Sequence, residues 1–148
     1  MSNPKELTYD IACVVRDDCL CLHLQRAARA TARRFDTAFR SFDLTNGQFS
    51  LLMSLNRPEP ASMRSVANLL AMDRTTLTAA LKPLQRRGLV TVATDPTDRR
   101  SRQLTLTPLG RDLLADTVPI WQREHAAIDA EFGVGGIDRL RADLRALL

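Results

Sequence analysis

The chain has 148 residues, a length that fits a single protein domain. Hydrophobic residues make up 45% of it and charged residues 26%, which excludes a wholly disordered chain, a collagen and a coiled-coil rod. No apolar run is long enough to span a membrane, and the first ten residues lack the pattern of a secretory signal, so we expect a cytoplasmic protein without a membrane partner. The three cysteines lie close together near the N-terminus, which is a poor basis for a disulfide framework.

The net charge of +4 is distributed unevenly along the chain. Residues 16–40 carry a net +3 and residues 82–111 a net +5, whereas residues 112–148 carry a net −3. A local surplus of positive charge attracts polyanions even when the whole protein is only mildly basic. A solvated charged face is the alternative interpretation, and the elements that surround the basic segments decide between the two.

Residues 10–42 are predicted to form one long amphipathic helix, because apolar residues recur at steps of three and four. Its apolar face comprises Leu20, Leu24, Ala27, Thr31, Phe35, Ala38 and Phe42, and Arg26, Arg29, Arg33 and Arg40 lie on the other face. A second helix is expected to begin at Thr45, because Thr45 and Gln48 have the spacing of a capping box. Pro58 and Pro60 mark its end.

The next segment is predicted to form two short helices and a β-hairpin. The first helix covers residues 62–71, and Asp73 is the expected N-cap of the second, which runs to about Arg87 and is closed by Gly88. The hydrophobic period then changes to alternation, which predicts two strands around the turn-rich residues 95–102. The alternating residues are Val90, Val92, Leu104 and Leu106.

A long fifth helix is expected from the cap Thr107 and the proline Pro108 to about Phe132. Glycines interrupt the chain at residues 133–136, and a last short helix follows. Its apolar residues are Ile137, Leu140, Leu144 and Leu147. The predicted fold is therefore mainly α with a small β-hairpin wing.

Two short helices joined by a tight link and followed by a basic hairpin indicate a winged helix-turn-helix, whose second helix enters the major groove of DNA. In that helix Leu77, Leu81 and Leu84 face inward. The outer side carries Thr75, Thr76, Ala79, Lys82 and Arg86, with Thr78 at its flank, and no acidic residue follows Asp73. Small hydroxyl residues and cations suit base edges and phosphates, although a plain exposed face is the alternative. Pro83 predicts a kink, or an end of the base-reading part near Lys82.

The tip of the hairpin carries Arg99, Arg100 and Arg102 beside Asp98. Arginine at a flexible tip can insert into the narrow, electronegative minor groove. We expect Asp98 to hold a neighbouring guanidinium in place through a bidentate ion pair. A solvated loop that tolerates these charges is the alternative.

Over roughly residues 17–125 the sequence resembles the MarR family of bacterial regulators. Its most specific part is Asp95-Pro-Thr-Asp-Arg-Arg-Ser-Arg102, and Asp73-Arg-Thr-Thr-Leu-Thr78 is similar to the start of that family's recognition helix, which adds Arg74 to the candidate DNA contacts. The resemblance implies that Arg100 reads the minor groove with support from Asp98. It also implies a repressor that binds a near-palindromic duplex and is released by a small molecule or by thiol oxidation.

The resemblance further implies a homodimer whose first and last helices intertwine. Residues 1–44 and 108–148 would then form the dimerisation helices, and residues 45–107 the DNA-binding lobe. The expected interface residues are Leu20, Leu24, Ile137, Leu140, Leu144 and Leu147.

Two kinds of signal could release such a regulator from DNA. A lipophilic or aromatic ligand would bind in a cleft lined by His23, Arg26, Phe49, Met53, Met63 and Trp121, each of which is otherwise an ordinary packing or surface residue. Alternatively, Cys21 lies where the peroxide-sensing branch of the family places its reactive thiol, although the one tyrosine, Tyr9, lies outside that context. A cysteine that acts as a small hydrophobic residue is the simpler interpretation.

Two other classes of function remain as rivals. An enzyme is disfavoured because the sequence offers only two histidines, no glycine-rich phosphate loop and no zinc-binding spacing, so neither a catalytic residue, a metal nor a cofactor is expected. A winged-helix module that binds protein or RNA is the second rival, and the basic wing tip argues against it.

Overall fold

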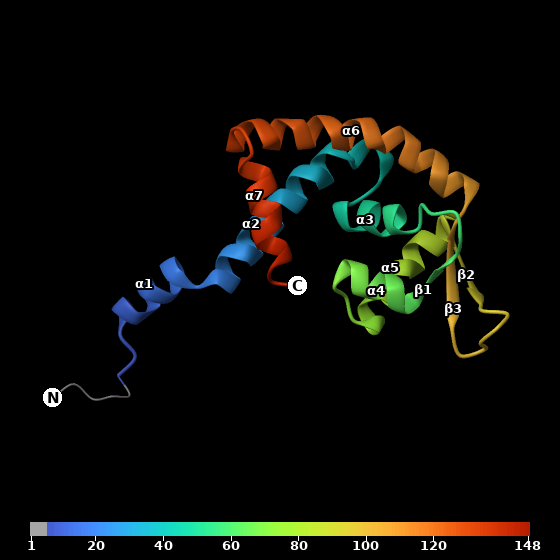
Figure 1. Ribbon diagram of the computed structural model, residues 1–148, viewed down its shortest axis with the longest axis horizontal. Helices are drawn as coiled ribbons and strands as arrows, with labels where there is room; N and C mark the ends of the chain where they lie inside the picture. The colour runs from blue at the N-terminus through green and yellow to red at the C-terminus, as the bar shows by residue number, and fades with distance from the viewer. Residues whose placement is uncertain (1–5) are drawn as a thin grey trace.

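The computed structural model describes residues 6–148, so the first five residues of the expected dimerisation segment lie outside it. In chain order the helices are α1 (Tyr9–Asp18), α2 (Leu20–Ala38), the 3-10 helix η1 (Arg40–Phe42), α3 (Asn46–Ser54), α4 (Met63–Leu70), α5 (Arg74–Arg86), α6 (Pro108–Phe132) and α7 (Gly136–Arg145). The strands are β1 (Ala61–Ser62), β2 (Val90–Thr94) and β3 (Arg102–Leu106). A mainly helical fold with a small β wing is thereby confirmed, and Figure 1 shows α6 passing over the lobe that α3, α4, α5 and the strands form.

The predicted helix over residues 10–42 is wrong in its extent, because the chain breaks it at Cys19. This residue has φ −69° and ψ 106°, an extended conformation that ends α1 and caps α2. None of the residues of α1 is buried, whereas α2 packs on α3 and α6 and buries Phe35. In Figure 1, α1 extends away from the rest of the molecule. The hydrophobic period could not reveal the break, because neither proline nor glycine marks it.

The start of α3 has the predicted capping box. The Thr45 hydroxyl accepts a hydrogen bond from the Gln48 backbone N–H at 3.2 Å, and the Gln48 side-chain oxygen accepts one from the Thr45 N–H at 3.0 Å. This helix begins the lobe and contributes to its hydrophobic core. The largest fully buried hydrophobic side chains of the core are Phe39, Leu51, Leu52, Val66, Leu77, Leu84 and Leu104.

The wing is a three-stranded antiparallel sheet in the order β1-β3-β2. Strands β2 and β3 form the predicted hairpin, in which Val90 pairs with Leu106 and Val92 with Leu104. Strand β1 was not predicted. It consists of two residues that pair with the other edge of β3, and two residues are too few to show an alternating pattern.

The start of α6 is fastened to the start of β2. The Thr107 hydroxyl caps α6 by accepting from the Gly110 N–H at 3.1 Å, and it donates to the Gly88 carbonyl at 2.6 Å. The Thr107 N–H donates to the Leu89 carbonyl at 3.1 Å. A side chain at Gly110 would collide with that same Leu89 oxygen, so only glycine fits the close approach of α6 to the wing.

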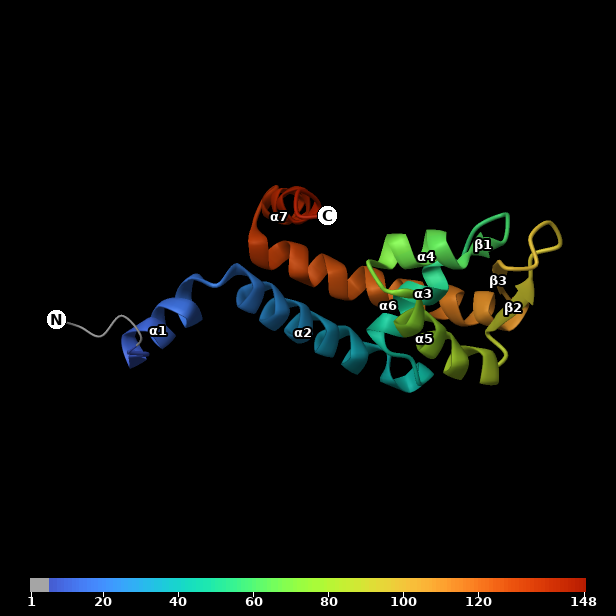
Figure 2. The same ribbon diagram turned by 90° about the horizontal axis from the view of Figure 1, so that it is seen from below.

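Helices α2 and α7 and the C-terminal half of α6 lie away from the wing (Figure 1). Arg34 on α2 forms ion pairs with Glu124 at 3.1 Å and with Glu131 at 2.8 Å, which tie α2 to α6. Beyond residues 133–135, α7 folds back and packs on α6, and Figure 2 shows it on the other side of α6 from α2. In Figure 1 it crosses in the same region as α2. Within residues 6–148, no helix has the combination of length and apolar character that crossing a membrane requires.

Candidate nucleic-acid interface

The orientation of α5 is fixed by its N-cap and by its buried leucines. The Asp73 carboxylate accepts hydrogen bonds from the Thr76 N–H at 2.7 Å and from the Thr76 hydroxyl at 2.8 Å. These bonds stabilise the charged carboxylate and lower the pKa of Asp73 below its usual range. Leu77, Leu81 and Leu84 are buried, as predicted, so the opposite side of the helix faces outward.

The outward side of α5 carries all of the residues predicted for the helix. Arg74, Thr75, Thr76, Thr78, Ala79 and Lys82 are all exposed. Five of these residues, without Thr76, line a shallow hollow of about 360 Å³. Pro83 lies inside the helix, which nevertheless continues to Arg86, so the helix itself does not stop at Lys82. We call these six exposed residues the α5 ridge.

The turn between β2 and β3 is built by two aspartates. Asp95 accepts from the N–H and from the hydroxyl of Thr97, both at 2.8 Å, and these bonds lower the pKa of Asp95. Asp98 accepts from the backbone N–H of Arg100 at 3.0 Å. The expectation that Asp98 pairs with a guanidinium is therefore wrong for this structure, because its carboxylate accepts from the main chain of the turn and forms no ion pair within residues 6–148.

The turn presents its arginines in two ways. Arg99 and Arg100 are exposed, and within residues 6–148 neither guanidinium is in an ion pair. Arg102 instead reaches across the hairpin, where its Nη1 donates to the Thr94 hydroxyl at 3.2 Å. We call residues 95–102 the wing tip. Figure 1 shows it projecting from the lobe at the end of β2 and β3.

One structural residue of the site was missed by the sequence reasoning. Arg87, at the end of α5, donates to the Asp43 carbonyl at 2.5 Å and to the Phe42 carbonyl at 3.1 Å. Asp43 has a left-handed backbone with φ 49°, so its carbonyl and that of Phe42 belong to a sharp turn after η1. The arginine therefore connects α5 to the end of the N-terminal helices. No local pattern in the sequence indicates this pairing across 44 positions.

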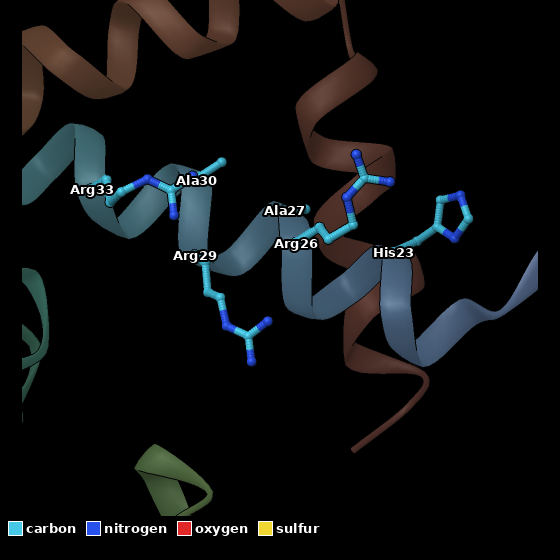
Figure 3. Close-up of a pocket in the computed structure, with 6 residues that line it drawn as sticks. All are labelled: His23, Arg26, Ala27, Arg29, Ala30 and Arg33. Atoms are coloured by element: carbon cyan, nitrogen blue, oxygen red, sulfur yellow. The ribbon is translucent and has the colours of Figure 1, made fainter. Parts of the chain in front are cut away.

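The predicted ligand-binding residues do not share one cavity within a single chain. Phe49, Met53 and Trp121 line an apolar hollow of about 420 Å³, together with Ser50, Ser54, Leu69 and Val118. Met63 is instead buried in the core, because it begins α4 at the sheet. His23 and Arg26 lie on the exposed side of α2 with Arg29 and Arg33, where Figure 3 shows the side chains pointing outward.

The cysteines lie around the break between α1 and α2. Cys21 is exposed in the first turn of α2, where its Sγ accepts a hydrogen bond from Gln25 at 3.3 Å. Cys19 is the N-cap of α2 and lies outside the helix that contains Cys21, because the single helix predicted over residues 10–42 is broken there. Tyr9 is exposed on α1, on the other side of the break.

The residues predicted for a dimer interface lie on a largely exposed apolar surface. Leu24, Ile137, Leu140 and Leu144 line a groove of about 550 Å³ between α2, α6 and α7, whereas Leu20 and Leu147 lie outside its lining and are exposed. Phe132 also lines the groove and is 49% exposed. We call this the α2/α6/α7 groove.

A polar cluster between α6 and α7 was not predicted, and two of its members, His125 and Arg141, line this groove. The Asp129 Oδ1 lies 3.3 Å from the His125 Nδ1 and 3.5 Å from the Arg141 Nη2, and Arg141 also pairs with Asp138 at 2.7 Å. These contacts hold α7 against α6. The spacing of His125 and Asp129, four residues apart on one helix, was the available signal. No group of three or more potential metal ligands occurs in the described part of the chain.

Known proteins share both the sequence and the fold of this chain. Residues 44–101 match the family model described as the MarR family. The transcriptional regulator MosR of Mycobacterium tuberculosis, solved in complex with DNA, is 36% identical, with a TM-score of 0.80 over 88% of this chain and 93% of that chain. BpsR of Bordetella bronchiseptica, whose DNA binding is regulated by 6-hydroxynicotinic acid, is 27% identical, with a TM-score of 0.76 over 88% and 98%.

Among curated proteins, the regulator TtmR of Methylorubrum extorquens is 34% identical over 97 residues, which are 66% of this chain and 50% of that protein. The matched part spans only 50% to 64% of the length of the first three curated relatives. All of these relatives are transcriptional regulators and not enzymes. Because the chain is 36% identical to a regulator of which it covers 93%, and because residues 44–101 match the family model, it belongs to the MarR family of transcriptional regulators.

Proposed function

We propose that the protein binds double-stranded DNA, with the α5 ridge in the major groove and the wing tip in the minor groove. The observation that carries this proposal is the joint exposure of both surfaces on one lobe. The ridge has two cations and no carboxylate, and none of the three guanidinium groups of the wing tip has an ion-pair partner in residues 6–148. A helix of this width fits the major groove, and arginine suits the narrow minor groove. The proposed site of action is the cytoplasm.

Selection from random duplex DNA tests this proposal directly. We expect the enriched duplexes to share one motif, and binding to weaken steeply as salt rises, because each phosphate contact releases counterions. Failure to enrich any motif would contradict sequence-specific recognition. Enrichment of single-stranded RNA over duplex DNA in a parallel selection would favour the rival winged-helix interaction module.

We further propose that the DNA-binding unit is a homodimer joined through the α2/α6/α7 groove and the exposed apolar residues of α1. Ile11, Val14 and Val15 on α1 are about half exposed, and none of the residues of α1 is buried. An unpartnered apolar helix and an apolar groove in one chain are typical of a surface that a second copy covers. Two copies related by a twofold axis would bind a pseudo-palindromic operator, with equivalent half-sites.

We propose that the protein is a repressor and that a small lipophilic or aromatic ligand releases it from DNA. The apolar hollow between α3 and α6 supports this, because Phe49 and Trp121 lie nearly parallel there, with ring centroids 6.4 Å apart, and Met53 and Trp121 are both 37% exposed. A ligand that binds only the folded protein raises its melting temperature, so a thermal-shift screen of aromatic acids and phenols would find candidates. Trp121→Ala should abolish the shift, whereas Leu109→Ala, which removes an exposed leucine outside the hollow, should leave it unchanged.

The alternative signal is oxidation of Cys21. Its exposure beside the break at Cys19 favours this reading, because a reactive thiol needs access to the oxidant. If the thiol is the sensor, an organic peroxide releases the wild-type protein from DNA and fails to release Cys21→Ser. Release of Cys21→Ser by peroxide would dispose of the thiol alternative.

A further inference from the structure

Two threonines on the α5 ridge have already used their hydroxyl protons inside the protein. The Thr76 hydroxyl donates to the Asp73 carboxylate at 2.8 Å, and the Thr78 hydroxyl donates to the Arg74 carbonyl at 2.8 Å. A hydroxyl group has a single proton. Towards any partner outside the helix, both oxygens therefore act only as hydrogen-bond acceptors.

The same bonds leave apolar groups at the centre of the ridge. Because the Thr78 oxygen is held against the helix backbone, its γ-methyl group is left for contact with a partner, next to the methyl group of Ala79. Both residues line the shallow hollow of the ridge, and the cations Arg74 and Lys82 lie at its ends. Around Thr78 and Ala79 the ridge thus presents methyl groups and acceptor oxygens, and its charged donors lie at the margins. Thr75, beside Arg74, lines the same hollow, and its hydroxyl makes no hydrogen bond within residues 6–148.

The base pairs differ in what they offer to such a surface. In the major groove an A·T pair presents the C5-methyl group of thymine and the N6 amino donor of adenine, whereas a G·C pair presents the N4 amino donor of cytosine, the two acceptors of guanine and no methyl group. Acceptor-only threonines match the amino donor of either pair, so the contact between methyl groups and the thymine methyl is what distinguishes A·T from G·C. An unpaired acceptor opposite the guanine edge would be unfavourable.

We infer that the centre of α5 reads A·T base pairs, with Thr78 and Ala79 contacting a thymine methyl group and a threonine oxygen accepting from adenine. The inference deepens the proposed DNA binding and rests on it. It assigns base specificity to the middle of α5, and it leaves Arg74 and Lys82 as contacts to the backbone or to flanking bases.

Deoxyuridine tests the inference, because it differs from thymidine only by the missing methyl group. Each thymidine of the selected motif is replaced singly by deoxyuridine, and the dissociation constant is measured at fixed salt. We expect at least one position to lose about fourfold in affinity, the effect of one buried methyl-sized group. Replacements in the flanking DNA serve as controls and should have no effect.

Thr78→Ser removes the γ-methyl group and keeps the hydroxyl that donates to the Arg74 carbonyl. This variant should bind the thymidine duplex less tightly and should no longer distinguish it from the sensitive deoxyuridine duplex. Thr37→Ser is the matched control, because Thr37 on α2 makes the same kind of bond to the Arg33 carbonyl, at 3.0 Å, away from the ridge. It should behave as the wild type does.

Different results would contradict the reading of A·T pairs and the binding of DNA itself. Tight, salt-sensitive binding that no deoxyuridine replacement weakens would overturn the A·T inference and leave DNA binding intact. Undiminished sensitivity to deoxyuridine in both Thr78→Ser and Ala79→Ser would also overturn it. Absence of binding to any duplex would contradict both statements.

Discussion

At the scale of single residues, the wing tip depends on which arginine is free to reach DNA. Arg102 is engaged with Thr94, whereas Arg100 has an exposed side chain and a backbone fixed by Asp98. We therefore expect Arg100→Ala to weaken binding to the selected duplex by about 1–3 kcal/mol, because a base-reading contact is lost. The measurement is a fluorescence-anisotropy titration at one salt concentration.

Arg123→Ala is the matched control for this variant. Arg123 is exposed on α6, which lies across the lobe from the wing tip in Figure 1. Its removal should leave affinity for DNA nearly unchanged. Equal affinity of Arg100→Ala and the wild type would remove Arg100 from the interface.

Asp73 gives the protein a defined response to acid. Its pKa is lowered in the folded state by the hydrogen bonds from Thr76, so its charged form stabilises the fold above the usual pKa of an aspartate, about 3.9. That contribution is lost as the pH falls through the lower folded-state pKa. Urea unfolding of wild type and Asp73→Asn should show a stability difference that is constant near neutral pH and shrinks below about pH 4. A difference that does not change with pH would show that this carboxylate is not the stabilising group.

At the scale of elements, the junction of α6 with β2 has no room for a side chain at Gly110. A Cβ atom at Gly110 would meet the Leu89 carbonyl oxygen and a Leu106 methyl group. Gly110→Ala should therefore destabilise the protein by about 1–3 kcal/mol, because overpacking shifts backbone. It should also weaken DNA binding, since the wing is attached at this point.

Gly47→Ala provides the comparison for Gly110→Ala. Gly47 lies in the first turn of α3, and a Cβ there would have no neighbouring atom within 4 Å. Alanine should preserve or raise stability, because glycine is the poorer helix residue. The measurement is the free energy of unfolding of both variants in denaturant. Equal free energies for the two would argue against a close contact at Gly110.

Substitutions in the α2/α6/α7 groove are expected to change the oligomeric state of the protein. Leu140 and Leu144 are 37% and 38% exposed in the single chain, so glutamate at both positions should not disturb its core. If a second copy covers the groove, the Leu140→Glu/Leu144→Glu protein should be a monomer in light scattering and should bind DNA weakly. Val134→Glu, at a fully exposed position between α6 and α7, should stay dimeric. A stable dimer of the double variant would exclude the groove as the interface.

At the scale of the whole molecule, local signals predicted more than contacts between distant segments. The capping box at Thr45, the cap at Asp73 and the strand alternation each depend on residues a few positions apart, and the structure confirms them. The break at Cys19 has no local marker, and β1 forms only because β3 lies beside it.

In the candidate site, too, some features follow from nearby residues and others depend on contacts between distant segments. The outward side of α5 follows from helix geometry and could be predicted in full from the buried leucines. The bond from Asp98 to a backbone amide, the bonds of Arg87 to a distant turn and the separation of Met63 from Trp121 depend on how the chain folds in three dimensions. No periodicity in the sequence contains that information.

The charge of the molecule is consistent with its proposed orientation on DNA. The net +5 of residues 82–111 covers the later part of α5 and the wing, whereas residues 112–148, which form most of α6 and all of α7, carry a net −3. A polyanion is therefore attracted to the lobe and repelled from the C-terminal helices.

The most direct test of DNA binding is the affinity for the selected duplex as a function of salt. Between 50 and 200 mM salt, the dissociation constant should rise about a thousandfold if about six phosphates are contacted, and a scrambled duplex should bind far more weakly at every concentration. Binding that does not depend on salt, or equal affinity for the scrambled duplex, would contradict the assignment of α5 and the wing tip as a sequence-specific DNA-binding surface.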